Sequence, residues 1–473
     1  MHRNSYLKSL GLMLLTLTLL PGCGDFFNFS TKPQSTPSVP TTPVASVSPV
    51  DGAANVPVDS AITVTFNVEA KLTTFVMKDD SGAQVSGTLT PSTGVSTSFT
   101  FSPAQLLPAT HYSVTVQAVD STGSVSSTRT TCSFTTAAAT PAPSWSFYQL
   151  PGSGTRDMGY FLNMKRSPID GALYITYYDD SDRALHITST TDGSSFSGPV
   201  TVAISSGGVS AGKDSSLAID STGHLHLSFL HEGVGMKYVT APAASGPWTV
   251  TTVDSSARDM ASTAMALDIN NKVHIVYHDY NANTLRYATN ATGEWKTELV
   301  DGTSSGSASA LQLDDQGHLH IVYTDDANGG LKYVTGTSAA WSTPVTLDVT
   351  GQMMFPSLVI RSGKIFCTYY DGLGHIKLAT TESGAWATSV VASDAGMSVP
   401  SLAIDSNGNL DAAYISGAGS LMYARRAASW VSNAIATGLG QGFFTAIALD
   451  ASGKASIIYH DAAHNGVGFA RQN

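Results

Sequence analysis

A pattern that recurs at intervals of 44 to 47 residues restricts this chain to a small set of folds. Its clearest copy runs from Met265 to Asp279, and each copy contains four short apolar stretches separated by polar or glycine-containing turns. The fourth stretch begins at a tryptophan, and these residues are Trp248, Trp295, Trp341, Trp386 and Trp430. Four short strands per unit at this period predict a β-propeller, whose four-stranded blades surround an axis.

The number of blades follows from the tyrosine or phenylalanine at the centre of each second strand. These residues are Tyr177, Phe229, Tyr277, Tyr323, Tyr369, Tyr414 and Tyr459, and they predict seven blades. Phe196 takes the place of the tryptophan in the first repeat. The seventh repeat ends after its third strand, while residues 145–150 have the form of an isolated fourth strand. We therefore expect this segment to complete the last blade, which would leave no open sheet edge.

The N-terminus predicts export and lipid anchoring. Residues 1–22 combine Arg3 and Lys8 with an apolar run that is too short to span a membrane, which is typical of a signal peptide. The sequence Leu20-Pro-Gly-Cys23 resembles the lipobox of bacterial lipoproteins, and this resemblance implies lipidation at Cys23. Residues 23–45 are rich in Ser, Thr and Pro, as expected for an extended tether. We expect a membrane-anchored protein of the cell envelope, at the outer membrane or the cell surface.

Residues 46–137 show two-residue alternation between apolar and polar side chains, with frequent turns, which predicts a β-sandwich. The stretch from Pro49 to Asp59 and the stretch from Leu107 to Tyr112 resemble bacterial Ig-like domains of surface proteins. Tyr112 stands where such a domain would have a tyrosine corner. The resemblance implies a spacer or adhesive module. The expected fold is therefore all-β, with an Ig-like sandwich before a seven-bladed propeller over residues 138–473.

One repeat contains a motif that suggests a family for the propeller. Ser189-Thr-Thr-Asp-Gly-Ser-Ser-Phe196 resembles the Asp-box of sialidase-like repeats, a turn between the third and fourth strands. Sialidases use three arginines to bind a substrate carboxylate. Only Arg156 and Arg258 lie in suitable loops, so sialidase activity is not expected.

A polar residue stands two positions after each second-strand aromatic residue, and these positions predict one set of candidate ligand-binding groups. They are Asp179, His231, Asp279, Asp325, Asp371, Ser416 and Asp461. Either each carboxylate accepts N–H groups of its own turn, or the carboxylates form a ring for sugar hydroxyls or a cation. Asp279-x-Asn-x-Asn283 resembles the start of a calcium loop but lacks its glycine and its final glutamate, so it matches a Ca²⁺ site only in part. On the ring interpretation, replacing Asp279 and Asp325 by Asn would weaken ligand binding without unfolding.

The loops that lead into the first strands supply a second candidate set on the same face. Arg156-Asp157 and Arg258-Asp259 are charged, whereas the loops of later repeats carry Met397 and Phe443-Phe444. Such a division could serve a carbohydrate or peptide pocket, or the charges could pair locally on a solvated rim. His226, His274 and His320 occupy one position in three adjacent repeats, and we interpret them, like the tryptophans, as structural.

Composition narrows the classes of function. The chain has 35 acidic and 24 basic residues, which argues against a nucleic-acid ligand. Three cysteines in separate segments do not indicate a disulfide framework. We expect a monomeric binding lipoprotein whose propeller recognises carbohydrate or another surface ligand, with no assignable catalytic residues. The alternatives are a glycoside hydrolase or polysaccharide lyase on the same face, and a scaffold for envelope proteins.

Overall fold

The structure is a computed structural model, and it describes residues 42–473 except 59, 124–126, 139–142, 204–208, 258–261, 304–305, 338–339, 350–353 and 428. The chain divides into two compact units, Met1–Ala139 and Thr140–Asn473. Both are built from strands, and the helical element among the described residues is one 3-10 turn, η1 (Ala462–His464). None of the helical structure in this part of the chain is long and apolar enough to cross a membrane. The expected signal peptide and Cys23 lie outside the described residues.

The first unit is the Ig-like sandwich. Its strands are β1 (Ala45–Ser48), β2 (Ala53–Val56), β3 (Ile62–Asp79), β4 (Gly87–Thr90), β5 (Ser96–Pro103), β6 (His111–Asp120) and β7 (Thr130–Thr136). They pair in the order β2-β7-β6-β3-β5-β4, with β1 added to β3. Alternate residues of β6, such as Val114 and Val116, are fully buried. The backbone N–H of Leu107 donates to the hydroxyl of buried Tyr112 at 2.7 Å, as expected for a tyrosine corner.

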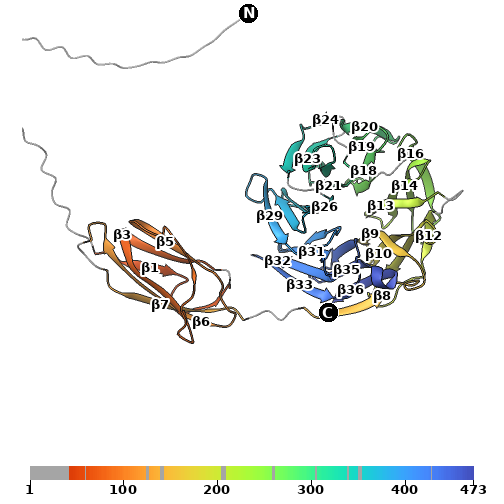
Figure 1. The fold of residues 1–473 in the computed structure, drawn as a ribbon. Helices are drawn as coiled ribbons and strands as arrows, with labels where there is room; N and C mark the ends of the chain where they lie inside the picture. The colour runs from red at the N-terminus through yellow and green to blue at the C-terminus, as the bar shows by residue number, and fades with distance from the viewer. Residues whose placement is uncertain are drawn as a thin grey trace, which may run out of the picture. The chain divides into compact units, whose positions relative to one another are not determined.

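The second unit is a seven-bladed propeller, so the predicted fold class is confirmed (Figure 1). Blade 1 contains β9 (Met158–Arg166), β10 (Leu173–Asp179), β11 (Ala184–Thr190) and β12 (Val200–Ala203). Blade 2 contains β13 (Ala211–Ile219), β14 (Leu225–His231), β15 (Gly235–Ala241) and β16 (Thr249–Asp254). Blade 3 contains β17 (Thr263–Leu267), β18 (Val273–Asp279), β19 (Thr284–Thr289) and β20 (Lys296–Asp301). Blades 4 and 5 contain β21 (Ser309–Leu313), β22 (Leu319–Asp325), β23 (Gly330–Thr337), β24 (Ala340–Trp341), β25 (Val345–Asp348); and β26 (Met354–Arg361), β27 (Lys364–Tyr370), β28 (Ile376–Thr380), β29 (Ala387–Ala392). Blades 6 and 7 contain β30 (Ser401–Ile404), β31 (Leu410–Ile415), β32 (Leu421–Arg426), β33 (Trp430–Ala436); and β34 (Thr445–Leu449), β35 (Ala455–Asp461), β36 (Gly466–Gln472).

The ring is closed by a strand from before the first blade. β8 (Trp145–Gln149) pairs antiparallel with β36, which confirms the predicted closure, and Figure 1 shows the two strands side by side near the C-terminus. The backbone N–H of Asn473 also donates to the carbonyl of Ser144 at 2.9 Å. Blade 7 therefore has four strands, and its third strand has no open edge.

Aromatic side chains join each blade to the next. Trp341 at the start of the outer strand of blade 4 meets Tyr287 in the third strand of blade 3, with ring centroids 5.2 Å apart. Phe196 meets Phe469 in the same way across blades 1 and 7, at 5.3 Å. Trp145 of the closing strand meets a tyrosine of blade 6 at 5.1 Å. The tryptophan series is thus part of the contact between blades, which agrees with its structural interpretation.

Blades 2, 3 and 4 share a buried polar relay, defined as a turn aspartate, a second-strand histidine and a third-strand tyrosine. In blade 3, Asp268 accepts the N–H groups of its own turn, and His274 Nδ1 lies 2.5 Å from the Tyr287 hydroxyl. The carboxylate of Asp268 lies 3.8 Å from His274 Nε2, which is beyond hydrogen-bond distance, so the aspartate and histidine are not bonded in blade 3. The same relay joins Asp220, His226 and Tyr238, and Asp314, His320 and Tyr333. Burial lowers the pKa of each of the three histidines.

A second set of bonds crosses between neighbouring blades near the loops that follow the second strands. Tyr323 of blade 4 donates its hydroxyl hydrogen to Asp301 at the end of blade 3, over 2.6 Å. The same bond joins Tyr277 to Asp254 and Tyr369 to Asp348, each at 2.6 Å. Burial raises the pKa of these tyrosines. The sequence analysis did not identify the aspartates, because only the closed ring brings one blade's fourth strand against the next blade's second strand.

Candidate functional site

The five aspartates that follow the second strands are buried, with exposed fractions of 1–5%. Each carboxylate bonds within its own loop or to an adjacent strand. Asp371 accepts two backbone N–H groups and the His375 ring N–H, and Asp325 contacts the Lys332 ammonium at 2.7 Å. The Gln149 amide of the closing strand donates to Asp461 at 3.0 Å. These carboxylates stabilise their loops, and ligand contact at these positions remains a prediction.

His231 and Ser416 occupy the same ring position in blades 2 and 6. Burial lowers the pKa of His231, and its Nε2 atom has no hydrogen-bond partner among the described residues. The Ser416 hydroxyl accepts the backbone N–H of Ser420 at 3.2 Å, so it closes its loop as the aspartates do.

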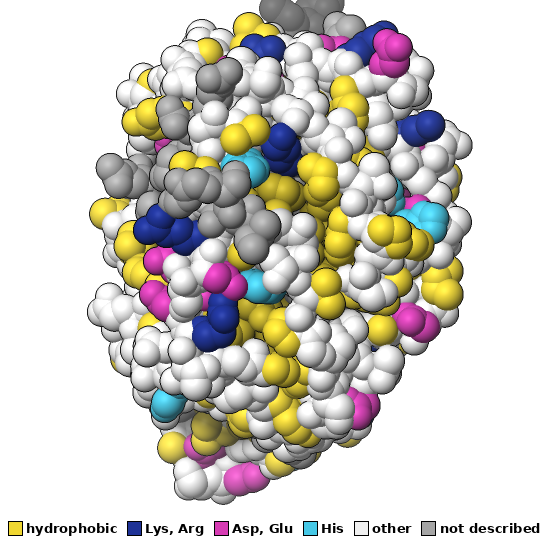
Figure 2. All heavy atoms as spheres, turned by 90° about the vertical axis from the view of Figure 1, so that its right-hand side faces the viewer, with side chains coloured by type: hydrophobic (Ala, Val, Ile, Leu, Met, Phe, Trp, Pro, Cys, Tyr) yellow, Lys and Arg dark blue, Asp and Glu magenta, His cyan; other side chains and the backbone are white. Residues whose placement is uncertain are grey.

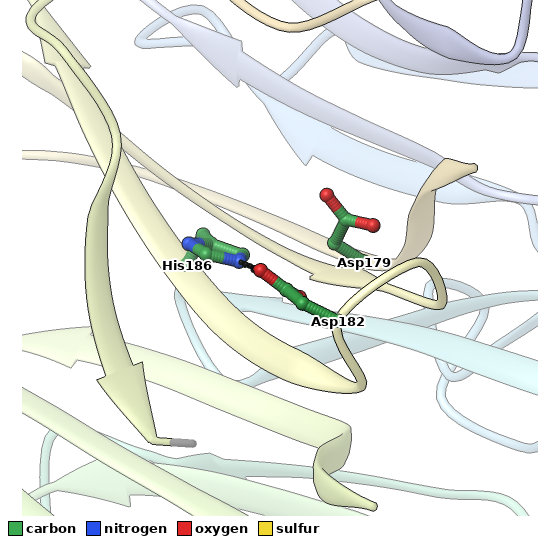
Figure 3. Close-up of side chains that lie close together, drawn as sticks. All are labelled: Asp179, Asp182 and His186. Atoms are coloured by element: carbon green, nitrogen blue, oxygen red, sulfur yellow. Dashed lines mark hydrogen bonds and ion pairs between the residues drawn. The ribbon is translucent and has the colours of Figure 1, made fainter. Parts of the chain in front are cut away.

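Blade 1 brings Asp179, Asp182 and His186 close together, as Figure 3 shows. Oxygen and nitrogen atoms of the three residues lie within 4.8 Å of one another, a set that could hold a divalent cation. However, the Arg156 guanidinium forms ion pairs with both carboxylates, and His186 Nε2 lies 3.0 Å from Asp182. One guanidinium thus already occupies the space between the two carboxylates, and a cation would have to displace Arg156.

The predicted charged loops are only partly described. Asp157 is exposed and accepts the Tyr160 hydroxyl at 3.1 Å, and its carbonyl accepts the backbone N–H of Asp180 at 2.8 Å. Lys213 pairs with Glu232 at 2.9 Å on the same side of blade 2. Arg258 and Asp259 lie outside the described residues. Local pairing thus accounts for the Arg156 charge, while Asp157 and Asp180 remain exposed.

Phenylalanines from three blades meet near the propeller axis. Phe444, which precedes β34, contacts Phe161 of β9 at 5.1 Å and Phe355 of β26 at 6.5 Å between ring centroids. Tyr160 lies 6.3 Å from Phe444. Blade 6 separates blades 5 and 7 in the ring, so Phe355 and Phe444 meet on its axial side. We call Tyr160, Phe161, Phe355 and Phe444 the axial aromatic cluster.

Two members of this cluster are held in an unusual backbone conformation. Phe161 and Phe355 have φ angles of 52° and 54°, and both lie where the pairing of the inner strand shifts register. Asp214 occupies the corresponding position in blade 2, with φ of 50°. Bulky side chains rarely adopt this region, and such strain concentrates at functional sites. Burial raises the pKa of Asp214 to about 7, so this carboxyl titrates near neutrality.

A hollow adjoins the axial aromatic cluster between blades 6 and 7. Met397, Gln441 and Phe443 contribute side chains, and the remaining wall is Gly396, Ser416, Gly417, Gly419 and Gly442. Met397 is 50% exposed. A Cβ atom at Gly442 would lie 2.3 Å from the His460 carbonyl, so a side chain there would displace the backbone. The predicted apolar loops therefore do border a hollow, and they supply Phe355 and Phe444 to the cluster, whereas Tyr160 and Phe161 were not among the predicted site residues.

Figure 2 views the molecule from the right-hand side of Figure 1, where β12, β14 and β16 lie. A band of hydrophobic side chains runs down this face, with Lys, Arg, Asp, Glu and His side chains gathered along part of its border. Apolar residues such as Val250 on β16 are 59% exposed. This face is therefore mixed in character, and in the described part of the chain the aromatic residues with positive φ are Phe161 and Phe355 of the inner strands.

Comparison with known proteins places the first unit. Residues 39–136 match the family model of the bacterial Ig-like domain. No curated protein matches the chain.

Among solved structures, AofleA from Arthrobotrys oligospora is 10% identical, with a TM-score of 0.45, and the match covers 62% of this chain and 91% of that chain. A fucose-recognising lectin of Aleuria aurantia with a six-bladed β-propeller fold is 10% identical, with a TM-score of 0.43, over 60% of this chain and 99% of that chain. An auxiliary nutrient binding protein of Bacteroides thetaiotaomicron is 10% identical, with a TM-score of 0.43, over 93% of this chain and 99% of that chain. We draw no functional argument from likenesses at this level.

Proposed function

We propose that this protein is a lipid-anchored envelope protein whose propeller binds carbohydrate at the axial aromatic cluster and the adjoining hollow. The observation that carries the proposal is the meeting of Phe161, Phe355 and Phe444 at the axis, two of them with strained backbones. Backbone strain of this kind persists only where the surrounding structure fixes it, and it concentrates at functional sites. The cluster is half-buried, so part of its aromatic surface faces solvent.

The chemistry beside the cluster suits a sugar. A sugar ring presents an apolar C–H face and a border of hydroxyls, and sites for such ligands combine aromatic surface with a few polar groups. Exposed Asp157 and Asp180 lie next to Tyr160, and Gln441 lies in the hollow near Phe443. The carboxylates and the amide can accept or donate to hydroxyls that the aromatic rings leave exposed.

The anchoring part of the proposal is supported by sequence alone. The basic and apolar residues 1–22 and the Leu20-to-Cys23 motif support export and lipidation, and residues 23–45 would lift the folded units from the membrane. The Ig-like domain would then act as a spacer. Metabolic labelling with a radioactive fatty acid tests this directly. The wild-type chain should be labelled and the Cys23→Ser variant should not, and equal labelling of both would reject the anchor.

Binding is tested with the chain lacking residues 1–23 on a glycan array, followed by calorimetry with the best glycan. Phe444→Ala should weaken that binding by about five- to thirtyfold, because one stacked aromatic contact contributes ~1–2 kcal/mol. Phe147→Ala is the matched control, since Phe147 is 44% exposed on the outer strand β8 and far from the axis in the ring order. Equal affinity of the two variants would reject the axial site.

The exposed carboxylates favour one enzymatic alternative. Asp157 and Asp180 flank Tyr160, whose pKa is raised to about 12 by burial and by the hydrogen bond to Asp157. Two carboxyl groups beside a bound sugar can support acid–base hydrolysis. Product analysis after incubation with the bound glycan decides between binding and turnover. Turnover that is lost in both Asp157→Asn and Asp180→Asn would establish an enzyme, and an unchanged glycan would leave a binding protein. If no glycan binds, the scaffold alternative is tested by recovery of envelope partners.

A further inference from the structure

A second, chemically different pocket lies at the seam where the ring closes, between blades 7 and 1. Its charged and amide side chains are Arg166, Asp192, Asp450, Lys454, Arg471 and Gln472, and we call it the seam pocket. Arg166 ends the inner strand of blade 1, and Arg471 and Gln472 belong to β36 of blade 7. It lies on the side of the turns that join first to second strands, so it is separate from the proposed sugar site.

The two arginines cross the seam but retain unused donors. Arg166 donates to the carbonyls of Leu449 and Gly171 at 3.1 and 2.7 Å. Arg471 donates through Nη1 to the carbonyl of Asp192. Each guanidinium has five N–H donors, so most remain available. Within the described part of the chain, the two arginines and Lys454 form no ion pair with a carboxylate.

The carboxylates of the pocket are directed to their own turns. Asp192 accepts the backbone N–H groups of Ser194 and Ser195, each at 2.8 Å. Asp450 accepts those of Ser452 and Lys454 at 2.9 and 3.0 Å. Burial lowers the pKa of Arg166, with the positive charge of Arg471 adding to the effect and Asp450 opposing it. Two guanidiniums are therefore close enough to repel each other in a protein whose net charge is −11.

We propose that the seam pocket binds a phosphate group, held by Arg166, Arg471 and Lys454. Guanidinium groups match phosphate oxygens with paired N–H donors, and the exposed Lys454 ammonium adds a flexible point charge. The Gln472 side-chain oxygen accepts the backbone N–H of Ala455 at 2.9 Å, which leaves its NH₂ group as a further donor. The bound anion would relieve the repulsion between the arginines and stabilise the seam.

The test measures binding of inorganic phosphate to the chain lacking residues 1–23, by calorimetry and by the rise of Tm with phosphate concentration. Lys454→Gln should weaken phosphate binding about tenfold, because one charge-assisted contact is lost. Arg471→Gln should abolish the binding. Lys454 is an exposed turn residue, so its variant remains informative if Arg471→Gln fails to fold.

Arg361→Gln is the matched control. Arg361 joins blades 5 and 6 through the carbonyls of Asp405 and Ser406, and the pocket that it lines contains Asp314 and Asp315. This variant should lose stability but bind phosphate as the wild type does. Equal phosphate affinity in all variants, or a wild-type Tm that does not respond to millimolar phosphate at constant ionic strength, would overturn the proposal.

The source of the phosphate is distinguished with vesicles. Vesicles that contain phosphatidic acid should compete with inorganic phosphate if the group belongs to a lipid, whereas vesicles of neutral lipid should not. If inorganic phosphate binds and neither kind of vesicle competes with it, the ligand is a small soluble phosphate compound. Because the seam pocket and the axial aromatic cluster share no residue, failure of either test leaves the other intact.

Discussion

The contacts among blades 2 to 4 and the contacts at the seam between blades 7 and 1 hold the same ring together by different means. In blades 2 to 4 a second-strand histidine contacts a third-strand tyrosine in each sheet, and Tyr–Asp bonds join consecutive blades from 2 to 6. At the seam these polar links are replaced by Phe196 against Phe469 and by two arginines that reach main-chain carbonyls. The regular blades are linked by bonds between side chains, whereas among the described residues the two seam arginines bond only main-chain carbonyls and keep unused donors.

The inner strands repeat this division at the axis. Phe161 and Phe355 belong to blades 1 and 5, and Phe444 leads into blade 7, while the aligned positions in blades 2 to 4 are Asp214, Ser262 and Ala308. The relay blades therefore contribute small or polar side chains, and blades 1, 5 and 7 contribute the aromatic surface. Regularity in this propeller marks stabilising structure, and departures from the repeat mark the candidate sites.

Removing the closing strand should have the largest effect on this comparison. Deletion of residues 144–150 exposes the edge of β36 and removes Trp145 from its contact with Tyr423. A domain of this kind has only about 5–15 kcal/mol of stability, so we expect loss of cooperative unfolding of the propeller. Scanning calorimetry measures this, with the transition of the Ig-like unit as the internal control. A deletion that melts like the parent would refute closure by β8.

Replacing loop carboxylates in blades 3 and 4 should destabilise the propeller, but less than removing the closing strand does. The double variant Asp279→Asn with Asp325→Asn removes both negative charges and puts an NH₂ group in place of one oxygen, beside the loop N–H of Ala282 and the Lys332 ammonium. We expect a loss of about 2–4 kcal/mol in the free energy of unfolding, because both groups are buried and bonded. Urea denaturation measures the loss. Unchanged stability together with weaker glycan binding would restore the carboxylate ring as a ligand site.

A pair of tyrosine substitutions compares blade 4 with blade 7 at one repeat position. Tyr323→Phe removes the hydroxyl that donates to Oδ2 of buried Asp301, which should cost about 1–3 kcal/mol. Tyr459 holds the same position in blade 7 and has no hydroxyl partner among the described residues, so Tyr459→Phe should change stability by less than about 0.5 kcal/mol. Both variants are compared by urea denaturation. Equal losses of unfolding free energy would show that the Tyr–Asp bond does not distinguish blade 4 from blade 7.

The histidine relays should give the smallest effect, visible only as pH dependence. Burial lowers the folded-state pKa of His226, His274 and His320, so below their unfolded value of about 6.5 the unfolded state binds more protons. Stability should therefore be complete above pH 6.5 and decline as the pH falls from there towards the folded-state pKa. His274→Gln should flatten this part of the Tm–pH profile. A profile as steep as the parent's would remove His274 from the titrating set.

Much of the fold could be predicted because its signals repeat. The aromatic residue that starts each fourth strand and the tyrosine that centres each second strand recur at one period, and their count yields seven blades. Trp145 repeats the same signal before the first blade, which was enough to predict closure. The Ig-like unit was equally legible from its two-residue alternation and from Tyr112. The candidate ligand-binding residues were harder to predict, because an aspartate that caps its own turn and an aspartate that binds a ligand have the same sequence.

Blade number, strand order and the closing strand were thus determined by the sequence itself, since local periodicity decides which side chains face a neighbouring sheet. Only the closed ring decided that Asp371 and Asp461 are buried in their loops, that Tyr323 meets Asp301, and that Arg166 approaches Arg471. It also brought Phe161, Phe355 and Phe444 to one axis. These residues lie far apart in the chain, and no local pattern specifies their contact. Their meeting depends on the twist and the number of blades that packing allows.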